Sequence, residues 1–211
     1  MIGTLICFIR HGETDWNVGK RIQGQTDIPL NETGQRQALA MAYSAAHHNF
    51  HAIYSSDLQR AHNTASALAE RRHIDVRPLP LLRERHYGIF QTITASEGAE
   101  RYPEAHRLYK ARDPDYDFET GESMVAFAQR VHAAVREMTR HHAGETIAAV
   151  SHAGVLDILY RKSTGRPLHT PRDFVIPNCA LNWFRFDQHG WHLEAWDDHH
   201  YLSSVIKESV E

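Results

Sequence analysis

The stretch TLICFIRHG, Thr4–Gly12, is an unbroken apolar run that ends in an arginine and a histidine, followed at once by a glycine. Continuous apolar runs of this length are typical of strands that are buried on both faces of a sheet. The run TIAAVSHAG, Thr146–Gly154, repeats the pattern, and a shorter run, AIYSS, precedes Asp57. Helical periodicity follows each run, so the sequence predicts a repeated strand-then-helix unit.

Repeated strand-then-helix units predict a mainly parallel sheet that is covered by helices on both faces. Near the C-terminus, ALNWFRFD and WHLEAWD alternate around QHG, so we expect a hairpin that adds an antiparallel edge. DVRPLP is predicted to be a weak edge strand because proline cannot donate to a sheet. The predicted fold class is therefore α/β, with a three-layer α/β/α sandwich.

The predicted domain organisation is one domain with an insertion. The 211 residues, 42% of them hydrophobic, are enough for one full core, and we expect residues 1–211 to form it. From about Arg85 to Gly121 the pattern breaks into short charged and aromatic pieces that contain Pro103 and Pro114. This segment is predicted to be a short cap over the sheet and not a linker.

Two helices carry predictions about individual residues. The helix from Thr33 has side chains at three- and four-residue steps that we expect to face the sheet, namely Leu39, Ala42, Tyr43 and Ala46. Asp57 directly precedes the next helix and is predicted to cap its N-terminus.

Composition excludes several classes of partner. The formal net charge of −3, from 23 Lys and Arg against 26 Asp and Glu, gives no general reason to bind nucleic acid or an anionic membrane. The apolar runs are too short to cross a bilayer, and the first residues lack the features of a signal peptide. Cys7 and Cys179 lack the close spacing of a metal or redox motif, so both are expected to be reduced. We expect a cytoplasmic monomer or homodimer.

The histidines and arginines at the strand ends are the candidates for chemistry. In open sheets of this kind the ligand lies beyond the carboxyl ends of the strands, where His11 and His152 both fall. Arg60, in the first turn of the following helix, can reach the same place. Packing Arg10, Arg60 and two imidazoles together is costly without an anion, whereas a phosphate would accept several charge-assisted hydrogen bonds. The sequence therefore predicts a phosphate site.

Glycines and amides near these strand ends leave two interpretations open. Gly12 and Gly154 would let the backbone approach a ligand, although either can equally be a turn residue only. Asn17 and Gln23 lie in a polar loop and could donate amide hydrogens to an anionic oxygen, whereas loop amides more often contact a turn or solvent. Their position in the fold decides between these interpretations.

Several motifs together resemble one known family. RHGETDWN is followed by QGQTDIPLNETGQRQA, and SSDLQRAHNTA, LRERHYG, TGESM and VSHAGVL come downstream in the family's order. On these motifs, which span nearly the whole chain, the sequence is similar to the histidine phosphatase superfamily, also called the phosphoglycerate mutase-like superfamily. The resemblance implies a phosphoglycerate mutase-like fold and an enzyme that uses neither a metal nor another cofactor.

The resemblance also implies individual roles. His11 would be the phosphoryl-accepting nucleophile, and Glu84 in LRERHYG would be the proton donor. Arg10, Arg60 and His152 would clamp the phosphate. Further phosphate or substrate contacts are expected at Asn17, Gln23, Gly24, Arg85, Tyr87 and Ala153.

Elementary chemistry supports the catalytic roles separately. Neutral imidazole is a good nucleophile near neutral pH, and nearby guanidinium groups disfavour its protonated form. In-line attack by His11 would form a phosphohistidine whose equatorial oxygens meet fixed cations and helix-start amides. Glu84 would protonate the leaving alkoxide and then activate water.

The pocket could pass the phosphoryl group to water or return it to a bound sugar acid. ERHYG, Glu84–Gly88, looks like the mutases, and a second anionic group could be bound by Tyr87 and the cap cations Arg85, Arg101, Arg107, Lys110 and Arg112. However, FQTITASEGAERY lacks the glycine and lysine usual in mutases, and YKARDPDYDF replaces the paired arginines expected there. We therefore predict a phosphomonoester hydrolase acting on a small phosphorylated metabolite, with phosphoglycerate mutase as the alternative.

Two interpretations from other classes stay open. His11, His152 and Glu84 could hold zinc, although no HExxH or close Cys/His spacing is present and two arginines would repel a divalent cation. The pocket could also bind a phosphorylated partner without catalysis. Glu84 argues against that interpretation, because simple phosphate binding needs no carboxylate there.

Overall fold

A computed structural model describes residues 3–203. Across these residues one six-stranded sheet has the order β3-β2-β4-β1-β5-β6. The strands are β1 (Thr4–Arg10), β2 (Ala52–Ser55), β3 (Val76–Pro78), β4 (Thr146–Ser151), β5 (Leu181–Asp187) and β6 (Gly190–Asp198). The first four in chain order are parallel, and β5 and β6 continue the sheet antiparallel. The predicted parallel sheet with an antiparallel edge is confirmed.

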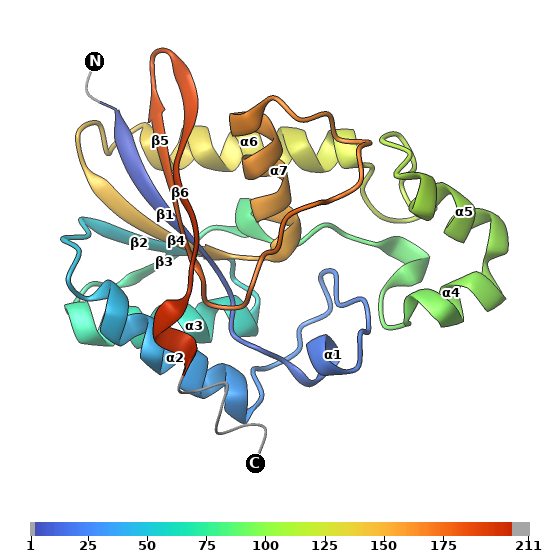
Figure 1. Ribbon diagram of the computed structural model, residues 1–211, viewed down its shortest axis with the longest axis horizontal. Helices are drawn as coiled ribbons and strands as arrows, with labels where there is room; N and C mark the ends of the chain where they lie inside the picture. The colour runs from blue at the N-terminus through green and yellow to red at the C-terminus, as the bar shows by residue number, and fades with distance from the viewer. Residues whose placement is uncertain (1–2, 204–211) are drawn as a thin grey trace.

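Helices cover both faces of the sheet. On one face lie α2 (Glu32–Ala45) and α3 (Gln59–Arg72), and on the other lie α6 (Met124–Thr139) and α7 (Ala153–Thr164), as Figure 1 shows. Alternate residues of β1 serve the two layers, because Ile6 and Phe8 pack with α6 and α7 whereas Cys7 and Ile9 pack with α2 and α3. This is the predicted three-layer α/β/α sandwich, and it explains the unbroken apolar run.

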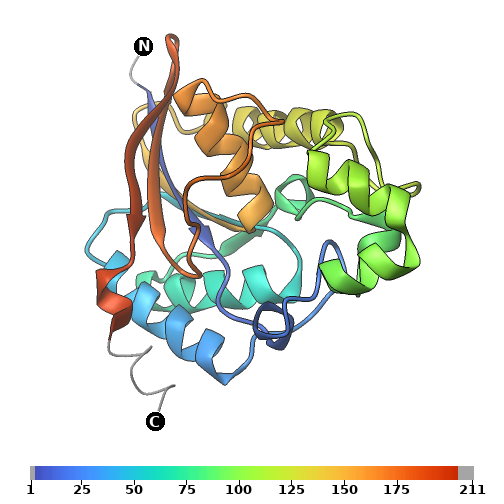
Figure 2. The same ribbon diagram turned by 45° about the vertical axis from the view of Figure 1, so that its right-hand side comes forward.

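Between the third strand and α6 the chain builds a separate group of short helices. After η1 (Pro80–Leu82) come η2 (Gly88–Phe90), α4 (Ala95–Arg101) and α5 (Pro103–Ala111), which stand to one side of the sandwich in Figures 1 and 2. We call residues 85–121 the cap segment. Its buried centre is its own cluster of Phe90, Ile93, Ala105 and Phe118.

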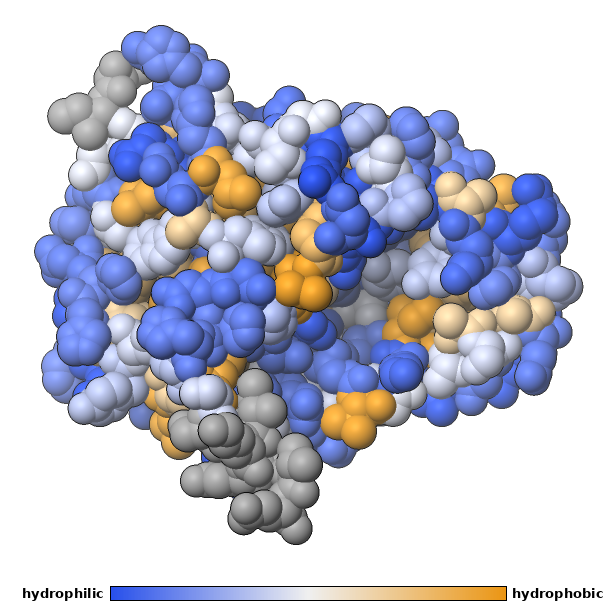
Figure 3. Space-filling model, viewed as in Figure 1, coloured by the Kyte–Doolittle hydropathy of each residue, from blue (hydrophilic) through white to orange (hydrophobic). Residues whose placement is uncertain are grey.

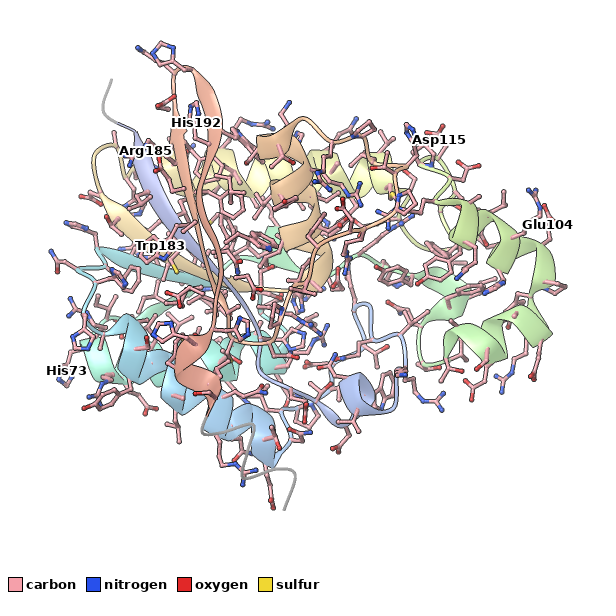
Figure 4. The ribbon with its side chains drawn as sticks, in the orientation of Figure 1. His73, Glu104, Asp115, Trp183, Arg185 and His192 are labelled. Carbon is pink, nitrogen blue, oxygen red and sulfur yellow. The ribbon has the colours of Figure 1, made fainter. Side chains whose placement is uncertain are left out.

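The hairpin lies at the opposite end of the molecule from the cap segment. In Figure 4, Arg185 and His192 lie on β5 and β6, far from Glu104 and Asp115 of the cap segment. Arg185 and His192 are paired in the antiparallel register, and Asp187 pairs with Gly190 across a tight turn. The predicted hairpin is confirmed.

Two short helices complete the described chain. These are α1 (Asp15–Val18), in the loop after β1, and η3 (His200–Leu202), after β6. None of the helices within residues 3–203 is long and apolar enough to cross a membrane.

The predicted buried face of α2 is wrong at Leu39 and Tyr43, although Ala42 is buried as predicted. Leu39 and Tyr43 are 64% and 63% exposed, whereas Ala38, Met41 and Ala45 face the sheet. Small side chains let α2 lie close to its neighbours, and its first turn is fixed by Gly34, where a Cβ would stand 2.1 Å from the Glu13 carbonyl oxygen. The prediction relied on the large side chains of Leu39 and Tyr43, whereas smaller side chains make most of the packed face.

The predicted helix cap at Asp57 is also wrong. Asp57 accepts two hydrogen bonds from the Arg83 guanidinium, and the residue before α3 is Leu58, whose side chain makes no cap. The amide of Gln59 instead donates to the Asp27 carboxylate at 2.8 Å. A carboxylate from a distant loop satisfies the helix start, which the local sequence does not reveal.

Candidate active site

The ends of β1, β2 and β4 bring the predicted residues together. The His11 amide donates to the Ser151 carbonyl at 2.9 Å, and the Ser56 amide donates to the Val150 carbonyl at 3.0 Å. These bonds align the residues that follow each strand at one edge of the sheet. The ring centroids of His11 and His152 are consequently 5.2 Å apart, as the convergence of strand ends predicts.

His11 is held as a neutral imidazole with one free nitrogen. Its Nδ1 lies 2.7 Å from the Gly12 carbonyl oxygen. Because a carbonyl only accepts, Nδ1 carries the proton and Nε2 keeps its lone pair. The residue is 4% exposed, and burial, aided by the charges of Arg60 and Arg10, holds its pKa well below the usual range. Nε2 is therefore a ready nucleophile.

His152 is fully buried beside His11. Its Nε2 lies 2.8 Å from the Ser56 hydroxyl oxygen, while its Nδ1 is buried without a partner among the residues described. Burial, together with the positive charge of Arg60, holds the pKa of His152 well below its usual range. With Ser56 donating to Nε2, the Nδ1–H is left as a donor for a ligand.

Backbone carbonyls hold the two arginines without neutralising them. Arg10 donates to the Ile176 carbonyl at 2.6 Å, and Arg60 donates to the Thr26 and Gly24 carbonyls at 2.8 and 2.7 Å. Neither guanidinium forms an ion pair with a carboxylate within residues 3–203. Burial lowers the pKa of each to about 10.

Unsatisfied donors gather at this point of the structure. The Nε atoms of Arg10 and Arg60 are buried without partners, as is Nδ1 of His152. Buried polar atoms are normally hydrogen-bonded, so three orphaned donors on neighbouring residues indicate a ligand rich in acceptor oxygens. A phosphoryl group has that chemistry and the matching negative charge.

Glu84 approaches the same space from the segment after η1. Its Oε1 accepts from the Arg85 amide at 2.8 Å, and its Oε2 accepts from the Gly154 amide at 3.0 Å. A Cβ on Gly154 would stand 2.1 Å from Oε1, so this glycine makes room for a carboxylate. Gly12 has a packing role instead, because its Cβ would meet the Gly34 carbonyl oxygen at 2.4 Å.

The loop after β1 adds amide groups. The Oδ1 of Asn17 accepts from the amide and the hydroxyl of Thr14, both at 3.1 Å, which leaves the Asn17 NH₂ group free to face the cavity. Gln23 lines the same cavity and is 8% exposed. Gly24 has φ +55°, a conformation that suits glycine, and its carbonyl anchors Arg60.

These groups line a cavity of about 450 Å³, which we call the phosphate cavity. Figure 3 shows the surface hollowed between the sandwich and the cap segment. The predicted residues in its lining are Arg10, His11, Asn17, Gln23, Gly24, Arg60, Glu84, Tyr87 and Ala153. Two predicted residues are not in this lining. His152 is fully buried beside His11, and the Arg85 guanidinium donates to the carbonyls of Tyr116 and Glu122.

Sequence reasoning missed several residues of the lining. The phosphate cavity also includes Lys20, Arg21, Ile22, Tyr109 and Arg172. Ser56, behind His152, had a signal, since it follows the second strand just as His11 follows the first. Arg172 had none, because it lies on a long irregular segment between α7 and β5 whose path depends on tertiary contacts.

The geometry does not favour zinc at these residues. The Nδ1 of His11, the Nε2 of His152 and both oxygens of Glu84 already have hydrogen-bond partners. Within residues 3–203 no group of three or more His, Cys, Asp or Glu side chains is placed to hold a metal ion.

Comparison with known sequences decides the family. Residues 6–199 match the sequence pattern of the histidine phosphatase superfamily (branch 1). The chain belongs to this superfamily. Residues 6–199 include every site residue discussed above, from Arg10 to Arg172.

Relatives within the superfamily differ in activity. A metal-independent phosphoserine phosphatase from Arabidopsis thaliana is 36% identical over 96% of this chain and 84% of its own length. Phosphoglycerate mutase-like protein 4 from the same plant is 34% identical over 95% of this chain and 87% of its own length. A mycobacterial glucosyl-3-phosphoglycerate phosphatase superposes with a TM-score of 0.81 at 31% identity, over 93% of this chain and its whole length.

Proposed function

We propose that this histidine phosphatase hydrolyses a small phosphomonoester through a phosphohistidine on His11. The observation that carries the proposal is the set of orphaned donors on Arg10, Arg60 and His152 around the unprotonated Nε2 of His11. Pure binding would need the cations alone, whereas this arrangement adds a nucleophile and a carboxylate. The phosphatases among its relatives support the same reaction class.

The first step transfers the phosphoryl group to the protein. Nε2 of His11 attacks phosphorus in line, the N–P bond forms, and the bond from phosphorus to the ester oxygen breaks. Glu84, as the carboxylic acid, gives its proton to the leaving alkoxide, which departs as an alcohol. Arg10, Arg60 and His152 bind the equatorial oxygens throughout, so charge is stabilised without reorganisation.

The second step returns the protein to its starting state. Glu84, now a carboxylate, accepts a proton from a water molecule whose oxygen attacks phosphorus. The N–P bond breaks, inorganic phosphate leaves, and His11 regains its lone pair. The Gly154 amide at 3.0 Å holds the carboxylate beside the cavity for both transfers.

The partners of the cap cations support hydrolysis over mutase chemistry. Return of the phosphoryl group requires a bisphosphorylated intermediate to stay bound, which calls for several free cations. Arg85 donates to two backbone carbonyls, Arg107 pairs with Glu104 on the exposed surface, and Arg112 pairs with Asp157. Because these three cap cations are engaged, fewer are left to retain a bisphosphorylated intermediate, which supports water as the acceptor.

Rapid-quench labelling tests the covalent route. Enzyme mixed with a ³²P-labelled phosphomonoester and quenched in base is expected to carry acid-labile label, and peptide mapping should place it on His11. His11→Ala should carry none and turn over at least 10³-fold more slowly. Rapid hydrolysis without any trapped label would contradict the proposal.

A matched assay separates hydrolysis from the mutase alternative. 3-Phosphoglycerate, with and without 2,3-bisphosphoglycerate, is followed for both free phosphate and the 2-phospho isomer. Release of phosphate without isomer supports the hydrolase, and isomer formation in excess of phosphate release would assign the mutase reaction instead.

A further inference from the structure

A smaller cavity adjoins the phosphate cavity beneath the cap segment. It has a volume of about 100 Å³ and is lined by residues of the cap segment, of α6 and of α7, together with Arg172. Four residues line both spaces, namely Tyr87, Tyr109, Gly154 and Arg172. Arg172 therefore lies between the cavity that would bind the phosphate of a substrate and the cavity that would contact the rest of it.

Asp157 fixes the position of Arg172. This α7 carboxylate is 5% exposed and accepts from three arginines, with Arg161 at 3.0 Å, Arg112 at 3.3 Å and Arg172 at 3.1 Å. One negative charge cannot balance three guanidinium groups. Two of the three, Arg112 and Arg172, line the smaller cavity, together with the carboxylates of Asp113 and Asp157.

The free end of Arg172 faces this space. Its Nε binds Asp157, but its two terminal nitrogens have no hydrogen-bond partner within the described chain, and its side chain is 38% exposed. Two other cations nearby are engaged, since Arg112 also donates to the Leu168 carbonyl and Arg21 pairs with Glu97, whereas Lys20 is exposed. Arg172 is thus a fixed cation with two unused donors.

We propose that Arg172 binds the carboxylate of a phosphorylated carboxylic acid substrate, with Asp157 as the residue that positions it. A guanidinium edge with two free N–H groups matches the two oxygens of a carboxylate. Burial lowers the pKa of Arg10, and the positive charge of Arg172, which lines the same cavity, lowers it further. A substrate with one anion at each end offsets both positive charges.

This assignment rests on the proposed phosphatase function, so its test compares two substrates within one active enzyme. O-phospho-L-serine is paired with O-phosphoethanolamine, and 3-phosphoglycerate is paired with glycerol 3-phosphate, which differ by the carboxylate. The wild-type kcat/KM is expected to favour the carboxylated member of at least one pair. Arg172→Ala should lower kcat/KM for that substrate by about 10- to 100-fold, the scale of a lost charge-assisted contact.

Two control variants complete the test. Arg166 lies on the same segment, pairs with Asp173 and does not line either cavity, so Arg166→Ala should keep the wild-type preference. Lys20 lines the phosphate cavity and is exposed, so Lys20→Ala tests the competing cation. Hydrolysis of p-nitrophenyl phosphate, which has no carboxylate, should fall by a smaller factor in Arg172→Ala than hydrolysis of the carboxylated substrate, because the contacts of Arg10, Arg60 and His152 to the phosphate remain.

The outcomes are distinct. A carboxylate preference that disappears in Arg172→Ala but persists in both controls supports the assignment. Hydrolysis of phosphomonoesters with no carboxylate preference, or a preference that survives in Arg172→Ala or is lost in Lys20→Ala, overturns it and leaves the phosphatase function standing. If no phosphomonoester is hydrolysed, both proposals fail.

Discussion

The amide of Gly154 donates to the Glu84 carboxylate at 3.0 Å, and a Cβ at Gly154 would stand 2.1 Å from the other carboxylate oxygen. Gly154→Ala must therefore push Glu84 from its position. We expect kcat for an alkyl phosphate to fall by about 10²-fold, the lower range for losing a positioned proton donor. Steady-state kinetics measure this.

The leaving group provides an internal check on that variant. Hydrolysis of p-nitrophenyl phosphate needs less help from an acid, so its kcat should fall less. Gly19→Ala is the matched control, because Gly19 is exposed and its Cβ would meet nothing closer than 3.4 Å. Equal losses with both leaving groups would argue against proton donation by Glu84.

Arg60 links the phosphate site to the loop after β1. Arg60→Ala is expected to lower kcat by about 10²–10³-fold, the scale of one lost preorganised donor. It also leaves the carbonyls of Thr26 and Gly24 unpaired, which should lower the free energy of unfolding by about 1–3 kcal/mol. Urea denaturation and kinetics measure the two effects, with the exposed Arg107→Ala as control.

Protonation of His11 should occur only in acid. Burial and two arginines hold its pKa well below 6.5, so the imidazole is expected to stay neutral at pH 6.5. Histidine NMR titration measures this directly, and added inorganic phosphate should raise the pKa by supplying an anion. A midpoint at or above 6.5 without ligand would contradict the geometry of the site.

The lowered pKa also predicts how stability depends on pH. As the pH falls below 6.5 the unfolded chain takes up protons at positions 11 and 152 that the folded protein does not, so the free energy of unfolding falls. This loss ends once the pH is below the folded pKa. Denaturation at a series of pH values should show a shallower slope for His11→Asn than for the wild type.

The corrected packing of α2 makes its own prediction. Leu39→Ala should change the free energy of unfolding by no more than about 0.5 kcal/mol, because Leu39 is 64% exposed. Leu68→Ala in α3 removes a fully buried side chain and should cost about 2–5 kcal/mol. Thermal or urea denaturation ranks the two, and a larger loss at Leu39 would contradict the described face of α2.

The layered fold and the meeting of strand ends could be predicted because they depend on chain-wide pattern. Parallel strands place their carboxyl ends at one edge, so His11 and His152 converge whatever the details of the loops. Contacts between distant segments were not predictable in this way. Asp57 binds Arg83 while Asp27 caps α3, and Arg172 is placed by Asp157, through pairings that local sequence does not encode.

Arg85 illustrates a different limit. The resemblance of ERHYG to mutases suggested a substrate contact at Arg85, but successive residues of an extended segment point to opposite sides. Glu84 faces the phosphate cavity, whereas the Arg85 guanidinium binds the Tyr116 and Glu122 carbonyls and lies over the Phe118 ring. Arg85 lines the smaller cavity instead, so a contact to the part of the substrate away from the phosphate stays a prediction.

The cap segment has a buried centre of its own, formed by Phe90, Ile93, Ala105 and Phe118 and distinct from the two clusters that flank the sheet. Substitutions there can change the part of the phosphate cavity that the cap segment lines, while the part lined by residues at the strand ends stays unchanged. Substitutions in the cap segment can therefore change which substrate is bound while the packing of the sheet and its flanking helices is kept.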